Sequence, residues 1–118
     1  MRKFFYLSTC YTCKLITKKL NFNNSIIKID IKKNPLNQEQ LEEIYKIVGS
    51  YEMLFNKRAQ LYKKRNLKEL KLQEGDYKKL LLEHYTFLKR PILIYDNNCF
   101  VGNANETVLE ANVFLNEQ

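Results

Sequence analysis

The 118-residue sequence is poor in the residues that interrupt regular structure: it has two prolines, three glycines and no low-complexity tract or repeat. With no Pro- or Gly-rich linker, its length is that of one domain with a single core. No stretch approaches the roughly 20 apolar residues that a membrane helix needs. Only residues 4–7 form an apolar run after Arg2-Lys3, which is too short for a secretory leader. We therefore expect a single cytoplasmic domain.

Cysteine is also scarce, with only Cys10, Cys13 and Cys99 present. In a reducing compartment three thiols do not indicate a structural disulfide framework. Positive charge is in excess, with 20 Lys and Arg against 13 Asp and Glu and a net charge of +7. The basic residues are dispersed over separate segments, which is typical of a solvated surface; attraction to nucleic acid, an acidic protein or an oxyanion is the alternative. We expect no direct nucleic-acid partner and no membrane partner.

The first third of the chain predicts a strand, a helix and a second strand. Residues 3–7 are apolar enough for a strand buried on both faces. Residues 8–9 then turn the chain into a helix whose apolar side chains include Leu15, Ile16 and Leu20. Residues 26–31 read as the second strand. Such a βαβ unit requires a parallel strand pair with a right-handed crossover.

The rest of the chain predicts a helical insert followed by a hairpin and a helix. Asn37, with Gln40 three residues later, is an N-cap signal for a helix that runs through Val48 and ends at Gly49. Shorter helical pieces are expected at residues 60–64 and 76–84. Residues 92–95 form a third strand, and residues 99–101 return antiparallel after a turn. Asn105 is expected to cap a last helix whose apolar positions are Val108, Leu109, Asn112-Val113 and Leu115.

This order, βαβ then a helical insertion then ββα, is that of an α/β protein with a thioredoxin-like fold. We expect residues 1–33 and 89–118 to form the sheet core of one domain spanning residues 1–118. Residues 34–88, between the second and third strands, would form a helical lobe.

The motif Cys10-Tyr-Thr-Cys13 lies where the first strand gives way to a helix. Unpaired backbone N–H groups and the helix dipole stabilise a thiolate there, so we expect the pKa of Cys10 to lie below the free value of about 8.5. Lys14 adds a positive charge nearby. Cys13, one turn deeper, can attack a mixed disulfide formed at Cys10. Cys10 is therefore predicted to be the nucleophile and Cys13 the resolving thiol.

Two other interpretations of the pair stay open at this point. A zinc site needs two further ligands, and the remaining candidates, Cys99 and His84, are isolated, so no metal is expected. A purely structural role for both thiols is the second alternative. We interpret Cys99 as a small buried strand residue and His84 as a partly exposed residue at a helix end.

Several segments together resemble the arsenate reductase ArsC/Spx family of thioredoxin-fold proteins over essentially the full chain. They are Tyr6-Leu-Ser-Thr-Cys10-Tyr-Thr-Cys13-Lys, Leu54-Phe-Asn-Lys-Arg58-Ala-Gln-Leu-Tyr62, Leu88-Lys-Arg90-Pro91-Ile-Leu-Ile-Tyr and Phe100-Val-Gly102. In that family a cysteine attacks arsenate, glutathione or glutaredoxin completes the reduction, and three arginines surround the oxyanion.

The resemblance implies that Arg58 and Arg90 correspond to two of these arginines and that Pro91 is cis. A guanidinium is a planar fork of donors suited to an oxyanion or thiolate; a surface salt bridge is the alternative for either arginine. No bound cofactor is implied, and glutathione is the expected co-substrate.

The chain departs from the family pattern in two ways. It carries a CxxC pair, as Spx does, and Asn103-Ala104-Asn105 offers no third arginine. Losing one charge-assisted donor costs about 1.5–3 kcal/mol, so we expect little or no arsenate reduction. The leading hypothesis is an ArsC-like thiol–disulfide oxidoreductase linked to glutathione, glutaredoxin or thioredoxin. The alternatives are an Spx-like, non-enzymatic redox regulator that binds RNA polymerase, and a degenerate member with an unknown binding role.

Overall fold

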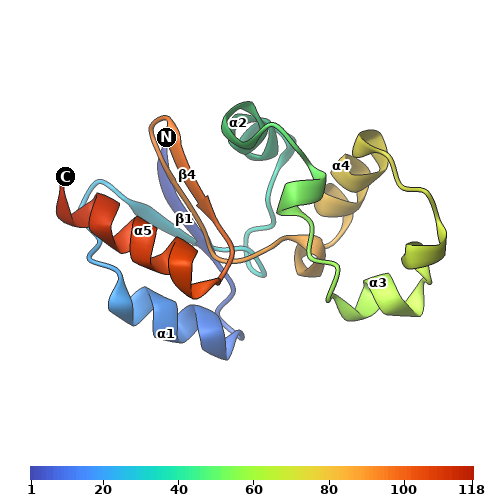
Figure 1. Ribbon diagram of the computed structural model, residues 1–118, viewed down its shortest axis with the longest axis horizontal. Helices are drawn as coiled ribbons and strands as arrows, with labels where there is room; N and C mark the ends of the chain where they lie inside the picture. Colours follow the sequence, from blue (N-terminus) through green and yellow to red (C-terminus); the bar gives the residue numbers. More distant parts are fainter. The chain divides into compact units, whose positions relative to one another are not determined.

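The computed structural model describes residues 1–118 and divides them into two units. The first comprises Met1–Asn34 and Arg90–Gln118, and the second Pro35–Lys89. Figure 1 shows that the first unit holds the strands with helices α1 and α5, whereas the second unit is helical. None of the helices is long and apolar enough to cross a membrane.

A single mixed sheet of four short strands forms the centre of the first unit. The strands are β1 (Arg2–Tyr6), β2 (Ile27–Asp30), β3 (Ile92–Tyr95) and β4 (Asn98–Val101). They lie in the order β2-β1-β3-β4. Strand β1 runs parallel to β2 and antiparallel to β3, and β3 forms an antiparallel hairpin with β4. The predicted βαβ and ββα arrangement is thereby confirmed.

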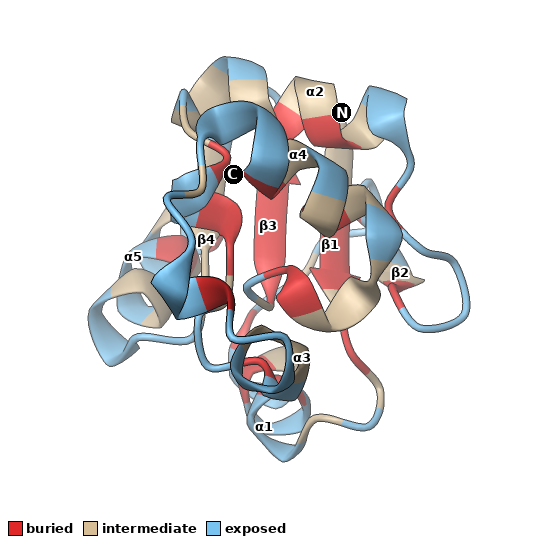
Figure 2. Cartoon of the chain, turned by 90° about the vertical axis from the view of Figure 1, so that its right-hand side faces the viewer, coloured by how far each residue is buried: buried red, intermediate tan, exposed pale blue.

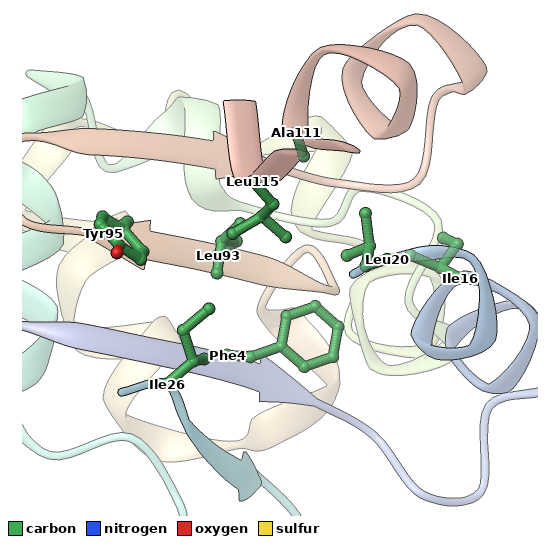
Figure 3. Close-up of a cluster of buried hydrophobic side chains, with 8 residues drawn as sticks. All are labelled: Phe4, Ile16, Leu20, Ile26, Leu93, Tyr95, Ala111 and Leu115. Atoms are coloured by element: carbon green, nitrogen blue, oxygen red, sulfur yellow. The ribbon is translucent and has the colours of Figure 1, made fainter. Parts of the chain in front are cut away.

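Helices α1 (Tyr11–Lys19) and α5 (Asn105–Asn116) supply the apolar side chains that cover one face of this sheet. Strand β3 is buried throughout and β1 is buried at Phe4 and Phe5, as the red parts of these strands in Figure 2 show. Figure 3 shows the side chains that meet between the strands and the two helices: Phe4, Ile16, Leu20, Ile26, Leu93, Tyr95, Ala111 and Leu115. Removal of this apolar surface from water is the main stabilising contribution to the unit.

Three of the apolar residues whose spacing predicts these helices are exposed rather than buried: Leu15 at 41%, Leu109 at 65% and Val113 at 50%. A helix turns about 100° per residue, which follows from 3.6 residues per turn. Because Ile16 faces the sheet, its neighbour Leu15 points sideways to solvent. Ala111 faces the core in α5, so Leu109 and Val113, two residues away on either side, point outward.

Two further expectations need correction. Ala104, not Asn105, is the N-cap of α5, and no side chain caps this helix; Asn105 is its first helical residue. Cys99 does lie in β4, but it is only half-buried, because β4 is one of the two edge strands of the sheet.

The second unit contains α2 (Gln38–Val48), α3 (Gln60–Lys64) and α4 (Glu74–Glu83), with 3₁₀ turns η1 (Glu52–Leu54), η2 (Leu67–Glu69) and η3 (Tyr85–Phe87). The predicted cap of α2 is confirmed: the Gln40 N–H donates to Asn37 Oδ1 at 2.8 Å, and the Asn37 N–H donates to Gln40 Oε1 at 3.1 Å. Gly49, with φ of 82°, ends the helix in the left-handed conformation.

Phe55 lies at the centre of the second unit. Its ring stacks on Phe87 at a centroid distance of 5.1 Å and meets the Tyr77 ring edge-on at 5.0 Å. Two backbone hydrogen bonds flank this contact. The Asn56 N–H donates to the Phe87 carbonyl oxygen at 2.7 Å, and the Lys89 N–H donates to the Leu54 carbonyl oxygen at 2.8 Å. The segments that carry Arg58 and precede Arg90 are thus held together within the unit.

Candidate redox site

A tight turn after β1 places Cys10 at the start of α1. The Cys10 N–H donates to the Leu7 carbonyl oxygen at 3.0 Å, which closes the turn over residues 7–10. Cys10 is the N-cap of α1, in extended conformation, and its own carbonyl accepts the first helical bond from the Lys14 N–H at 3.1 Å. The half-buried thiol therefore lies among the unpaired N–H groups of the helix N-terminus.

These surroundings lower the pKa of the Cys10 thiol. Burial alone would raise the pKa, but the backbone N–H and the thiol of Cys13, the positive charge of Arg90 and the backbone N–H of Thr12 outweigh it. Hydrogen bonds and positive charge both favour the ionised form of an acid. These groups thus favour the thiolate form of Cys10.

Cys13 has the opposite character. It is 1% exposed, and burial raises its pKa to about 11. The backbone N–H of Leu7 and the Arg90 charge oppose this effect, while the nearby charge of Cys10 reinforces it. The pair therefore consists of a half-buried sulfur whose ionised form is favoured and a buried sulfur whose protonated form is favoured, which is the division of labour that thiol–disulfide exchange needs.

Arg90 lies close enough to the cysteine pair for its positive charge to lower the pKa of both thiols. The Arg90–Pro91 peptide bond is cis, in agreement with the resemblance. The Pro91 carbonyl oxygen accepts a bond from the Gly102 N–H at 2.8 Å, which ties the start of β3 to the end of β4. Lys14 is an exposed residue of α1.

Arg58 belongs to the second unit, so its predicted role at the cysteine pair stays a prediction. It lies in a turn before α3, where its backbone N–H donates to Asn56 Oδ1 at 3.0 Å, and its side chain is exposed. The turn closes with a bond from the Ala59 N–H to the Asn56 carbonyl oxygen at 3.2 Å.

One residue near the turn over residues 7–10 has no role predicted from the sequence, where it offers no clear general base: Asp30, the last residue of β2. It is buried, with 6% exposure. Burial alone would raise the pKa of this carboxyl, but donors from Ser8 and Lys32 and the charge of Lys33 hold it below its ordinary value. The signal available in the sequence was an acid placed between two isoleucines at the end of an apolar run.

Cys99 and His84 take no part in this site. Burial raises the pKa of Cys99 to about 12. His84 caps the turn η3 by accepting the Thr86 N–H on Nδ1 at 3.2 Å, and it is partly exposed, as predicted. The structure contains no group of three or more His, Cys, Asp or Glu side chains that could hold a metal ion.

The fold and the cysteine pair together define a thioredoxin-like protein with a candidate redox site at the start of its first helix. The ArsC family model matches residues 5–111. The chain therefore belongs to the ArsC family.

Individual relatives agree with this assignment. An arsenate reductase of Haemophilus influenzae is 33% identical over 73 residues, an alignment that covers 60% of this chain and 63% of the relative. Among solved structures, an ArsC family related protein from Bacteroides fragilis has a TM-score of 0.73 at 20% identity, covering 93% of this chain and 97% of the other. An arsenate reductase from Vibrio cholerae has a TM-score of 0.72 at 21% identity, covering 93% and 96%. These two structures show the fold, and the thioredoxin-like prediction is confirmed.

Proposed function

We propose that this protein is a cytoplasmic thiol–disulfide oxidoreductase that works through Cys10 and Cys13. The observation that carries the proposal is the opposite shift of the two thiol pKa values, lowered at the helix N-terminus and raised to about 11 in the buried position one turn on. A structural pair of thiols does not need this asymmetry. A catalytic pair does, because only the attacking sulfur has to be ionised.

The reaction proceeds in two exchanges. The Cys10 thiolate attacks one sulfur of a substrate disulfide, forms a mixed disulfide and expels the other sulfur as a thiolate. Cys13 then loses its proton to solvent and attacks Cys10 Sγ, which releases the second substrate thiol and leaves a Cys10–Cys13 disulfide. Two electrons have passed from protein to substrate. Glutathione, glutaredoxin or thioredoxin returns them by the same chemistry.

Arg90 has two roles in this proposal. Its positive charge favours the thiolate form of Cys10, and its guanidinium is a donor for an anionic substrate such as glutathione, with its carboxylates. Arg58 and Lys14 would add positive charge for the same substrate. Arsenate is a weaker candidate, because Asn103-Ala104-Asn105 offers no third arginine after β4.

The test is reduction of a mixed disulfide between glutathione and a small thiol, followed through coupled regeneration of glutathione. Cys10→Ser should abolish turnover. Cys13→Ser should still react once and retain glutathione on Cys10, which mass spectrometry detects as an adduct. Turnover by Cys10→Ser would refute the proposal.

A redox regulator would give a different set of results. In that case the wild-type pair would form its disulfide but show no turnover with any thiol donor, and only one redox state would bind RNA polymerase. This outcome would replace the catalytic proposal with the regulatory one.

A further inference from the structure

Asp30 is a buried carboxylate beside the redox loop for which the proposed reaction has no use. Its Oδ1 accepts the backbone N–H of Ser8 at 3.3 Å and the backbone N–H of Lys32 at 3.2 Å. Its Oδ2 is buried and accepts no hydrogen bond. Burying a charged oxygen without a hydrogen-bond donor costs free energy of folding. An aspartate at this position is therefore expected to contribute something that offsets this cost.

The register of the sheet places Asp30 next to the loop. In the parallel pair of β1 and β2, Asp30 lies opposite Tyr6, and the Ile31 N–H donates to the Tyr6 carbonyl oxygen at 2.9 Å. Both strands therefore end at the same edge of the sheet. From that edge β1 continues directly into Leu7 and Ser8, within reach of the carboxylate.

The turn that Asp30 holds at Ser8 determines the surroundings of both thiols. Its first residue, Leu7, provides the backbone N–H that bonds to the Cys13 sulfur and the carbonyl oxygen that accepts the Cys10 N–H. Its last residue is Cys10 itself, the N-cap of α1. A shift of this turn would move the Cys10 sulfur away from the N–H groups of the helix start.

We propose that Asp30 is a positioning residue that fixes the turn over residues 7–10 through the Ser8 N–H and so keeps Cys10 Sγ at the N-terminus of α1. The inference rests on the proposed function and adds to it a residue that never touches the substrate. The working feature is the acceptor oxygen Oδ1, because the backbone N–H groups of Ser8 and Lys32 both donate to it; the Ser8 side chain adds a further hydrogen bond to the carboxylate. Asparagine retains such an oxygen, whereas alanine does not.

The test compares four full-length reduced proteins: wild type, Asp30→Ala, Asp30→Asn and Asp96→Ala. Asp96 is the matched control, an exposed carboxylate of the same unit that accepts bonds from Arg2. The rate at which iodoacetamide alkylates Cys10 is measured from pH 5 to pH 10, with the modified residue assigned by mass spectrometry. At pH 7 we expect Asp30→Ala to react about 3- to 10-fold more slowly, because its thiolate fraction falls.

Asp30→Asn and Asp96→Ala should react as fast as wild type. An Asp30→Ala rate equal to that of wild type would overturn the inference, as would an Asp30→Asn protein as slow as Asp30→Ala. Failure of the proposed function is a separate result that would appear in the wild type itself. Cys10 would then titrate with the pKa of an ordinary cysteine, and the wild-type protein would show no turnover of a disulfide substrate.

A second measurement needs no variant and keeps the inference testable if Asp30→Ala does not fold. The amide signals of Ser8 and Lys32 are followed by NMR in the wild type from pH 6 to pH 2. Both amides donate to the same carboxylate, whose ionised form the charge of Lys33 also favours. The two amide signals should therefore shift together, with one apparent pKa below the ordinary value for aspartate. Independent titration of the two amides, or no shift, would overturn the inference.

Discussion

The buried thiol of Cys13 makes the stability of the reduced protein depend on pH in a way that its removal should abolish. Burial raises the pKa of Cys13 from 9.0 to about 11. The unfolded chain therefore releases this proton near pH 9, while the folded chain keeps it until about pH 11. The stability linked to this thiol is fully present below pH 9 and is lost as the pH rises through 11.

The size of the effect follows from the difference between the two pKa values. A tenfold change in proton affinity corresponds to about 1.4 kcal/mol, so the contribution of Cys13 is roughly 2–3 kcal/mol, of which about 2 kcal/mol is lost between pH 8 and pH 11. The side chain is 1% exposed, so screening by solvent does little to reduce this figure.

The assay is urea unfolding followed by circular dichroism, on wild type and Cys13→Ala, at pH 8, 9, 10 and 11 with a non-thiol reductant. Apart from Cys10, whose pKa the Cys13 thiol itself lowers, the other groups that titrate in this range are common to both proteins and cancel in the difference. Between pH 8 and pH 11 the free energy of unfolding should decrease in both proteins. We expect the decrease to be about 2 kcal/mol smaller in Cys13→Ala than in wild type.

Ile16→Val is the matched control, because Ile16 is buried on the same face of α1 and does not titrate. It should cost about 0.5–1.5 kcal/mol at every pH. Parallel curves for wild type and Cys13→Ala would refute the reasoning. They would mean that Cys13 titrates equally in the folded and unfolded chains, and the asymmetry behind the proposed function would be lost.

Three further predictions address the cap, the core and the charge at the site. Asn37→Ala removes the side-chain acceptor at the start of α2 and should lower the free energy of unfolding by about 1 kcal/mol, measured by chemical denaturation; an unchanged midpoint would contradict it. Leu93→Ala, in the core of the first unit, should cost about 2–5 kcal/mol in the same assay, and a cost below that of Ile→Val substitutions elsewhere would argue against the packing described. Arg90→Met should raise the pKa of Cys10, because it removes a charge that lowers it, and slow its reaction with glutathione disulfide at pH 7 in stopped-flow experiments; Lys14→Met is the control with the smaller expected effect.

The sequence alone was sufficient wherever local chemistry decides the structure. The pairing of Asn37 with Gln40 and the glycine at position 49 set both ends of α2. An uninterrupted apolar segment gave strand β3 at residues 92–95. The spacing of Cys10 and Cys13 after a strand placed a thiol at a helix start, where the N–H groups of the first turn are unpaired whatever the rest of the chain does.

Other features depended on which elements pack together. Leu15 and Val113 are as apolar as Ile16, but only the direction in which each helix docks on the sheet leaves them in solvent. Burial raises the pKa of Cys13, and the positive charge that lowers the pKa of both thiols comes from Arg90, which is 77 residues further along the chain than Cys13. Asp30 acquires its contact with Ser8 through the parallel register of β1 and β2. Periodicity along one segment carries no information about such contacts, because they arise between segments that are distant in the chain.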